Sequence, residues 1–145
     1  MRAALEEAKK AQERDEVPIG AVIADRKKEK IFSASGNRTI ELSDPTAHAE
    51  ILAIREVCKK QGVQRIPGLA LYVTLEPCAM CAAAVSFARL EKVTFAATDP
   101  KGGGVLHGGK FFEQPTCHHR PEISHGILSE ECAALLSNFF KSKRT

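Results

Sequence analysis

The stretch "LALYVTLEPCAMCAAAVSFARLEKV" (residues 69–93) decides the fold, because it contains a strand, a helix and the start of a second strand. The apolar run 69–75 is typical of a buried strand, and it ends just before Pro77. Proline is tolerated in the first turn of a helix, where backbone amides have no intrahelical partner. Residues 79–89 therefore predict a helix, and "KVTFAAT" (92–98) predicts the next strand. This order is typical of α/β proteins.

The rest of the chain continues the alternation. The other predicted elements are a helix at 2–15, strands at 17–24 and 30–36, a helix at 47–60, a short segment at 121–127 and a final helix at 129–141. The apolar runs at 17–24 and 69–75 barely alternate, as expected for strands that are covered on both sides. The sequence therefore predicts an α/β sheet with helices on both faces.

Composition indicates one globular domain over residues 1–145, with 43% apolar and 27% charged residues. The N-terminal "MRAALEEAKKAQERDE" lacks the apolar region of a secretory signal, and no apolar run reaches membrane-spanning length. We therefore expect a cytoplasmic protein with no membrane partner. The net charge of +3 is low for a free-standing nucleic-acid binder. On composition alone, the basic end "FFKSKRT" is a solvated helix terminus.

The five cysteines include a pair, Cys78 and Cys81, at the start of a predicted helix. An odd number of cysteines without an export signal argues against a disulfide framework. A helix N-terminus stabilises the thiolate, which is the form that binds metal. A thioredoxin-like redox pair has the same placement, so the pair alone leaves metal binding, redox chemistry and plain packing open.

A second motif, "TAHAEIL" (46–52), changes this balance. His48 with Cys78 and Cys81 makes three ligands, which leaves the fourth position of a tetrahedral zinc for water. Bound zinc lowers the pKa of that water to about 7, and Glu50 is a carboxylate suited to move protons. A lone His-x-Glu is a weak signal. His-x-Glu followed by Pro-Cys-x-x-Cys is the signature of zinc-dependent base deaminases.

These motifs and several further segments resemble the bacterial tRNA-specific adenosine deaminases (the TadA family), within the cytidine-deaminase-like superfamily. The matching segments are "EVPIGAVI" (16–23), "GNR" (36–38), "DPTAHAEILAIR" (44–55), "LYVTLEPCAMC" (71–81), "ATDPK" (97–101), "HRPEI" (119–123) and "GILSEECAALLSNFF" (126–140). The resemblance implies a three-layer α/β/α fold with a central mixed five-stranded sheet. It also implies a homodimer with one Zn²⁺ per subunit. The implied reaction is hydrolysis of the wobble adenosine, position 34, to inosine in the anticodon of tRNA for arginine, with release of ammonia.

The resemblance also implies roles for individual residues. His48, Cys78 and Cys81 would hold zinc, Glu50 would transfer protons, and the Cys78 backbone amide would hold the attacking hydroxyl in place. Asn37 matches a residue that recognises the base, although Gly36-Asn37 read without the family is a turn. The positions that match substrate contacts are Asn37, Ala47, Pro77, Asp99, Lys101, His119, Arg120 and Phe140. The cations expected at RNA phosphates are Lys101, Lys141, Lys143 and Arg144.

Two features depart from the family pattern. Ala83 stands where glycine is more frequent, and we expect this to alter only helix packing. The loop 101–119 is unusually rich in glycine and carries His107, so the preference for sequence context stays open. A second metal at Cys117, His118 and His119 is disfavoured, because these residues crowd into one turn.

Three other functions remain open from the sequence. A free cytidine, cytosine or guanine deaminase would use the same zinc motifs. A non-catalytic zinc-stabilised nucleic-acid-binding module would have no use for Glu50, and a thioredoxin-like protein would have none for His48.

For the adjacent Phe139 and Phe140 we expect one inward and one outward ring. Cys58 and Cys132 are expected to be buried, and the small residues of "AAAVSFA" (82–88) suggest a dimer contact.

Overall fold

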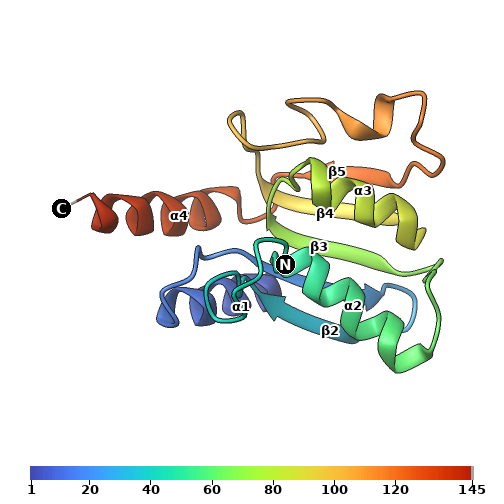
Figure 1. Cartoon of the computed structure of the whole chain (residues 1–145), viewed down its shortest axis with the longest axis horizontal. Coiled ribbons are helices and arrows are strands. Elements are labelled where there is room, and N and C mark those ends of the chain that lie inside the picture. Colours follow the sequence, from blue (N-terminus) through green and yellow to red (C-terminus); the bar gives the residue numbers. More distant parts are fainter. Residues whose placement is uncertain (145) are drawn as a thin grey trace.

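The computed structural model describes residues 1–144 and has a mixed five-stranded sheet in the order β2-β1-β3-β4-β5 (Figure 1). β1 is antiparallel to both β2 and β3, whereas β3, β4 and β5 are parallel. The elements are α1 (Arg2–Glu13), β1 (Gly20–Asp25), β2 (Lys30–Gly36), α2 (Ala49–Gln61), β3 (Ala70–Leu75), α3 (Ala79–Ala88), β4 (Lys92–Ala97), the 3₁₀ turn η1 (Phe111–Glu113), β5 (Glu122–His125) and α4 (Ser129–Lys143).

The helices form a layer on each face of this sheet, which confirms the predicted three-layer α/β/α fold. α1 and α4 pack on one face, and α2 and α3 pack on the other. The central strands β1 and β3 are mostly buried, as their continuous apolar runs predicted. None of the helices between residues 1 and 144 combines the length and apolar character that crossing a membrane requires.

The predicted element boundaries are correct to within a few residues, with two instructive differences. α1 ends at Glu13 because Asp15 has a left-handed backbone with φ of 64°. Sheet pairing in β1 begins at Gly20 rather than at Val17, since Pro18 has no amide hydrogen to donate. At Gly20 a Cβ would lie 1.9 Å from the Ala4 carbonyl oxygen, so glycine allows α1 to pack directly on β1.

Side-chain burial matches most of the sequence-based expectations. Ala4, Leu5, Ala8 and Ala11 of α1 are buried, as the helical periodicity predicted. Cys132 is buried, whereas the expectation that Cys58 is buried is wrong, since its side chain is only partly covered. The core under α2 and α3 is centred on Ile23, Val57, Leu71, Val85 and Phe95.

Candidate active site

The candidate site lies where the N-termini of α2 and α3 meet, beyond the carboxyl end of β3. His48 is the N-cap residue of α2 and Cys78 is the N-cap residue of α3, both with extended backbone, and neither side chain caps its helix. Their side chains are therefore free to face one another. Cys81 follows one turn into α3 and is completely buried. The positive ends of both helix dipoles point at this position, which favours bound anions and thiolates.

The three predicted metal ligands are brought together in a geometry that suits zinc. Their ligand atoms all lie within 4.8 Å of one another. The Nδ1 atom of His48 is 3.6 Å from the Sγ atom of Cys78 and 3.6 Å from that of Cys81. A tetrahedral Zn²⁺ with Zn–S bonds of about 2.3 Å and a Zn–N bond of about 2.0 Å would separate sulfur from nitrogen by about 3.5 Å. The residues present therefore fit the ion.

The two thiols of the cluster differ in acidity. A hydrogen bond from the Cys81 thiol, together with His48, lowers the pKa of Cys78 to about 4. The same contact and burial raise the pKa of Cys81. The hydrogen bond with Cys78 also raises the pKa of His48. These shifts favour Cys78 over Cys81 as the thiolate, and a zinc ion bound to both sulfurs would hold both as thiolates.

Glu50 lies in the first turn of α2, beside the cluster but outside its ligand set. Its side chain is almost completely buried, and this burial raises the pKa of Glu50 to about 7, while its own backbone amide and His48 act in the opposite direction. A carboxyl group that titrates near neutrality can both accept and donate a proton at physiological pH. The geometry therefore suits proton transfer next to the cluster.

Asn37, Ala47 and Pro77 surround this centre. The Oδ1 atom of Asn37 accepts a hydrogen bond of 2.8 Å from the Ala49 backbone amide and so holds the first turn of α2. Its Nδ2 group makes no hydrogen bond to any of residues 1–144, and it is the part of the side chain that remains for a substrate. Ala47 and Pro77 are buried directly before the ligands His48 and Cys78.

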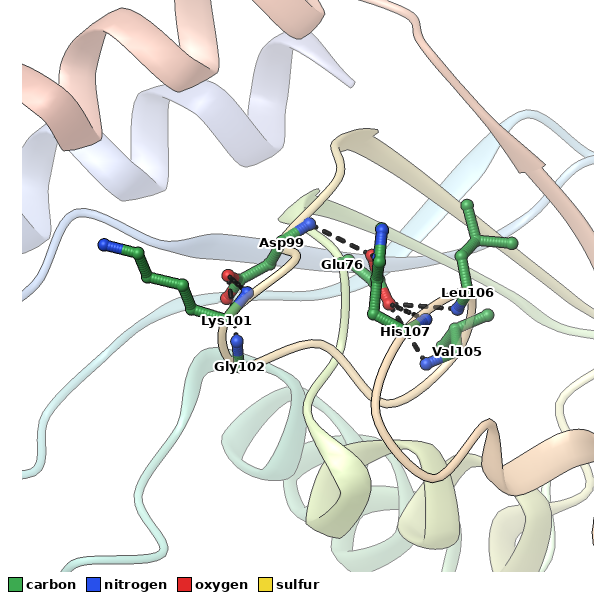
Figure 2. Close-up of polar contacts among 7 residues, drawn as sticks. All are labelled: Glu76, Asp99, Lys101, Gly102, Val105, Leu106 and His107. Carbon is green, nitrogen blue, oxygen red and sulfur yellow. Dashed lines mark hydrogen bonds and ion pairs between the residues drawn. The ribbon is translucent and has the colours of Figure 1, made fainter.

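Two buried glutamates that the sequence analysis missed hold the loops around the site. Glu16 accepts hydrogen bonds from the Thr39 hydroxyl and from the backbone amides of Ile40 and Glu41. Glu76 binds the loop 99–107 in the same manner (Figure 2). The available signal was a carboxylate next to an apolar strand in "EVPIG" and "TLEPC". Such a group must find several donors if it is buried.

The remaining predicted substrate residues fall into two groups, and the first lies at the carboxyl ends of β3 and β4 and on α4. Asp99 and Phe140 both line a cleft of about 390 Å³ between the ends of β3 and β4 and helix α4. Phe140 is 45% exposed and Phe139 is 7% exposed, which confirms that one ring points outward and the other inward. The Asp99 carboxylate accepts hydrogen bonds from the backbone amides of Lys101 and Gly102. The Lys101 side chain is exposed.

The second group, His119 and Arg120, lies at the opposite end of α3 from the cluster. The Nε2 atom of His119 is 2.7 Å from the carbonyl oxygen of Leu90, which follows α3. Arg120 donates to the backbone carbonyls of Phe112 and Gln114. Within one subunit, these two residues are therefore not brought to His48 or Glu50.

Comparison with known proteins identifies the class and then the family. Residues 1–97 match the family model of the cytidine and deoxycytidylate deaminase zinc-binding region, the class of protein that this fold and site define. The chain is 55% identical to a tRNA-specific adenosine deaminase of Agrobacterium fabrum over 99% of this chain and 93% of that protein. A solved structure from a study of A-to-I editing by tRNA:A34 deaminases at the wobble position matches with a TM-score of 0.91 and 55% identity, covering 94% of this chain and 97% of that one. The chain belongs to the family of tRNA-specific adenosine deaminases, as the sequence motifs predicted.

The fold is also similar to that of enzymes with smaller substrates. A guanine deaminase from Nitrosomonas europaea matches with a TM-score of 0.81 at 22% identity, covering 94% of this chain and 80% of that one. At this identity the likeness shows the fold alone. The zinc motifs are common to deaminases of tRNA and of free bases, so they do not distinguish the substrates.

Proposed function

We propose that this chain is a single zinc-dependent deaminase domain, residues 1–145, that hydrolyses the wobble adenosine of a tRNA anticodon to inosine and releases ammonia. The observation that carries the proposal is the ligand triad His48, Cys78 and Cys81 beside the buried, unliganded Glu50. A structural zinc site is closed by four protein ligands, whereas three ligands leave a position for chemistry. The membership of the family supports the substrate class, a tRNA anticodon. That this tRNA is the one for arginine is part of the proposal.

In the proposed reaction the chain's own groups move the protons. When bound to the triad, one Zn²⁺ per subunit supplies a water activated at a pH near 7. The Glu50 carboxylate accepts a proton from the attacking water and delivers it to the adenine ring. It then accepts the remaining proton from the hydroxyl added to carbon 6 and passes it to the amino group. The bond between carbon 6 and that nitrogen breaks, so that water and adenosine become inosine and ammonia. Positioned proton transfer of this kind contributes about 10²- to 10⁴-fold.

The base is proposed to lie between Asn37 and the walls formed by Ala47 and Pro77. The Nδ2 group of Asn37 faces no protein partner among residues 1–144 and would donate to an acceptor on the purine. The Cys78 backbone amide, at the start of α3, would hold the attacking hydroxyl. A nucleotide stacked in a loop cannot reach this depth, so the wobble base must be turned out of the stack.

The mouth of the site is suited to RNA rather than to a free base. The exposed ring of Phe140 at the cleft offers a surface on which an unstacked base can lie. Lys101 and the end of α4, with Lys141, Lys143 and Arg144, supply exposed cations for phosphates. Lys143 also contacts Asp15, so its charge is partly compensated. A cytoplasmic location accords with a tRNA substrate and stays a prediction.

A homodimer is proposed through the outer face of α2 and α3. Phe87 is 67% exposed on α3 and borders a groove of about 270 Å³ with Ile54 and Ala84. Aromatic residues are enriched at protein interfaces, and exposed apolar patches often mark them. His119 and Arg120 lie at the opposite end of α3 from the metal cluster of their own chain. In a dimer they could lie near the site of the other subunit. We propose that they contact RNA bound at the neighbouring subunit.

The test offers the purified enzyme an anticodon stem-loop of arginine tRNA, free adenosine, free cytidine and guanine, and measures inosine and ammonia. We expect turnover of the stem-loop and binding that weakens steeply with salt, because phosphate contacts release counterions. Rapid turnover of a free compound with none on the stem-loop would identify a small-molecule deaminase. Bound zinc without ammonia release from any compound would identify a non-catalytic module.

A further inference from the structure

Glu76 is a completely buried carboxylate to which the proposed chemistry gives no role. It follows β3 and its side chain has no exposed surface. Figure 2 shows the loop 99–107 folded around it, with five hydrogen bonds converging on its two oxygens. The donors are the backbone amides of Asp99 (3.0 Å), Val105 (3.2 Å), Leu106 (2.9 Å) and His107 (3.2 Å), and the Nδ1 atom of His107 (2.8 Å).

The loop is held by Glu76 and also by the Asp99 carboxylate, by backbone hydrogen bonds of Gly103 and Gly104, and by the buried Val105. It contains three consecutive glycines, Gly102 to Gly104, which have no side chains to pack and many accessible backbone conformations. A Cβ at Gly103 would lie 2.2 Å from the Glu76 Oε2 atom, and one at Gly104 would lie 2.6 Å from the Ala79 backbone nitrogen. The glycines are therefore required for the loop to reach the carboxylate and the first turn of α3.

The donors come from both ends of the loop. The Asp99 amide lies at its start, and the amides of residues 105–107 lie at its end. A buried carboxylate without such partners would be costly. One buried carboxylate thus orders both ends of the loop.

This loop begins at the cleft between the ends of β3 and β4 and helix α4. Asp99 lines the cleft that also contains Phe140, and its side chain orients the Lys101 turn. We propose that Glu76 is a positioning residue for RNA, which fixes the loop 99–107 as a wall of the mouth so that Asp99 and Lys101 meet the nucleotides flanking the target adenosine. His107 is the side-chain partner in this anchor. The role in RNA positioning rests on the proposed function, because that function supplies the RNA substrate. The anchoring of the loop by Glu76 is independent of it.

The test compares Glu76→Gln, His107→Ala and the control Thr94→Val with the wild-type enzyme, all loaded with zinc. Glutamine keeps the shape of Glu76 but replaces one acceptor oxygen by an NH₂ donor. This donor would face the amide donors of the loop and could not accept their hydrogen bonds. Thr94→Val removes the partly buried hydrogen bond between Thr94 on β4 and Ser124 on β5, outside the loop 99–107. Steady-state kinetics on the stem-loop are combined with amide hydrogen exchange of residues 105–107.

If Glu76 positions RNA through the loop, its replacement should raise KM. If the replacement only unfolds part of the protein, the apparent kcat falls and KM stays unchanged. We expect KM to rise about tenfold in Glu76→Gln and about threefold in His107→Ala, with kcat within about twofold and zinc retained. Thr94→Val should keep the wild-type KM. Exchange of the 105–107 amides should accelerate in Glu76→Gln while α3 stays protected.

The opposite results overturn the proposal. The first is a wild-type KM together with wild-type hydrogen exchange in Glu76→Gln. The second is loss of zinc from that variant, which would assign the carboxylate to the metal site. If Glu76→Gln is insoluble, His107→Ala decides by the same KM criterion. A wild-type enzyme without activity on the stem-loop would refute the proposed function and the role in RNA positioning, and the exchange experiment would still decide whether Glu76 anchors the loop.

Discussion

Replacement of Glu50 by glutamine is the most direct test of the division between metal binding and proton transfer. Glutamine has the size of glutamate but cannot take up a proton at neutral pH. We expect turnover of the stem-loop to fall by about 10²- to 10⁴-fold, equivalent to about 3 to 5 kcal/mol of transition-state stabilisation. Zinc content should remain close to one ion per chain, because Glu50 lies outside the ligand cluster.

The structure also predicts the effect of this change on stability. Among residues 1–144, no backbone amide of another residue donates to Glu50, so a glutamine there leaves no such donor unpaired. The free energy of unfolding should change by less than about 1 kcal/mol. Glu16→Gln is the matched comparison, since Glu16 is equally buried but accepts three hydrogen bonds from the loop 39–41. It should lose about 1 to 3 kcal/mol.

The assay is single-turnover inosine formation, with zinc measured by mass spectrometry and unfolding followed in urea. The control Cys81→Ser should lose zinc and turnover together. If Glu50→Gln purifies without zinc, then Glu50 is a ligand and the assignment of roles is wrong. If it retains turnover within tenfold of wild type, another group transfers the protons.

The other predictions concern the metal, α4 and the subunit contact. Removal of zinc with a chelator should lower the melting temperature, because the ion joins the N-termini of α2 and α3; an unchanged melting temperature would contradict this. Phe139→Ala should cost about 3 to 5 kcal/mol of stability, since this ring is buried, and urea unfolding measures it. Phe140→Ala should keep stability within about 0.5 kcal/mol while raising KM for the stem-loop, and a wild-type KM would exclude it from RNA binding. Phe87→Glu should give monomers in sedimentation at micromolar concentration, and a persistent dimer would place the interface elsewhere.

Much of the fold followed from local patterns. The apolar run 69–75, Pro77 and the alanine-rich segment after it predicted the strand and helix that carry Cys78. Periodicity in α1 identified its buried alanines correctly. The boundaries at Asp15 and Gly20 were less predictable, because they depend on a left-handed backbone and on contact between α1 and β1.

The members of the cluster His48, Cys78 and Cys81 could be named from spacing, since these residue types in this order restrict the chemistry to few possibilities. The anchors could not be named in this way. Glu16, Glu50 and Glu76 are all glutamates next to apolar segments, and only their three-dimensional partners separate them. Glu50 faces the ligand cluster and receives few hydrogen bonds, whereas Glu16 and Glu76 are saturated with donors from loops that are distant in sequence.

The sequence was sufficient for the layers of the fold, the ligand triad and the family, because these depend on residue type at short spacings. Tertiary structure separated the buried carboxylate beside the histidine and cysteine cluster from the two that are saturated with donors, and it placed His119 and Arg120 away from that cluster. The physical reason is that burial of a charge is costly unless donors are present, and those donors come from elements up to 31 residues away, as between Glu76 and His107. Only the folded chain brings such groups together.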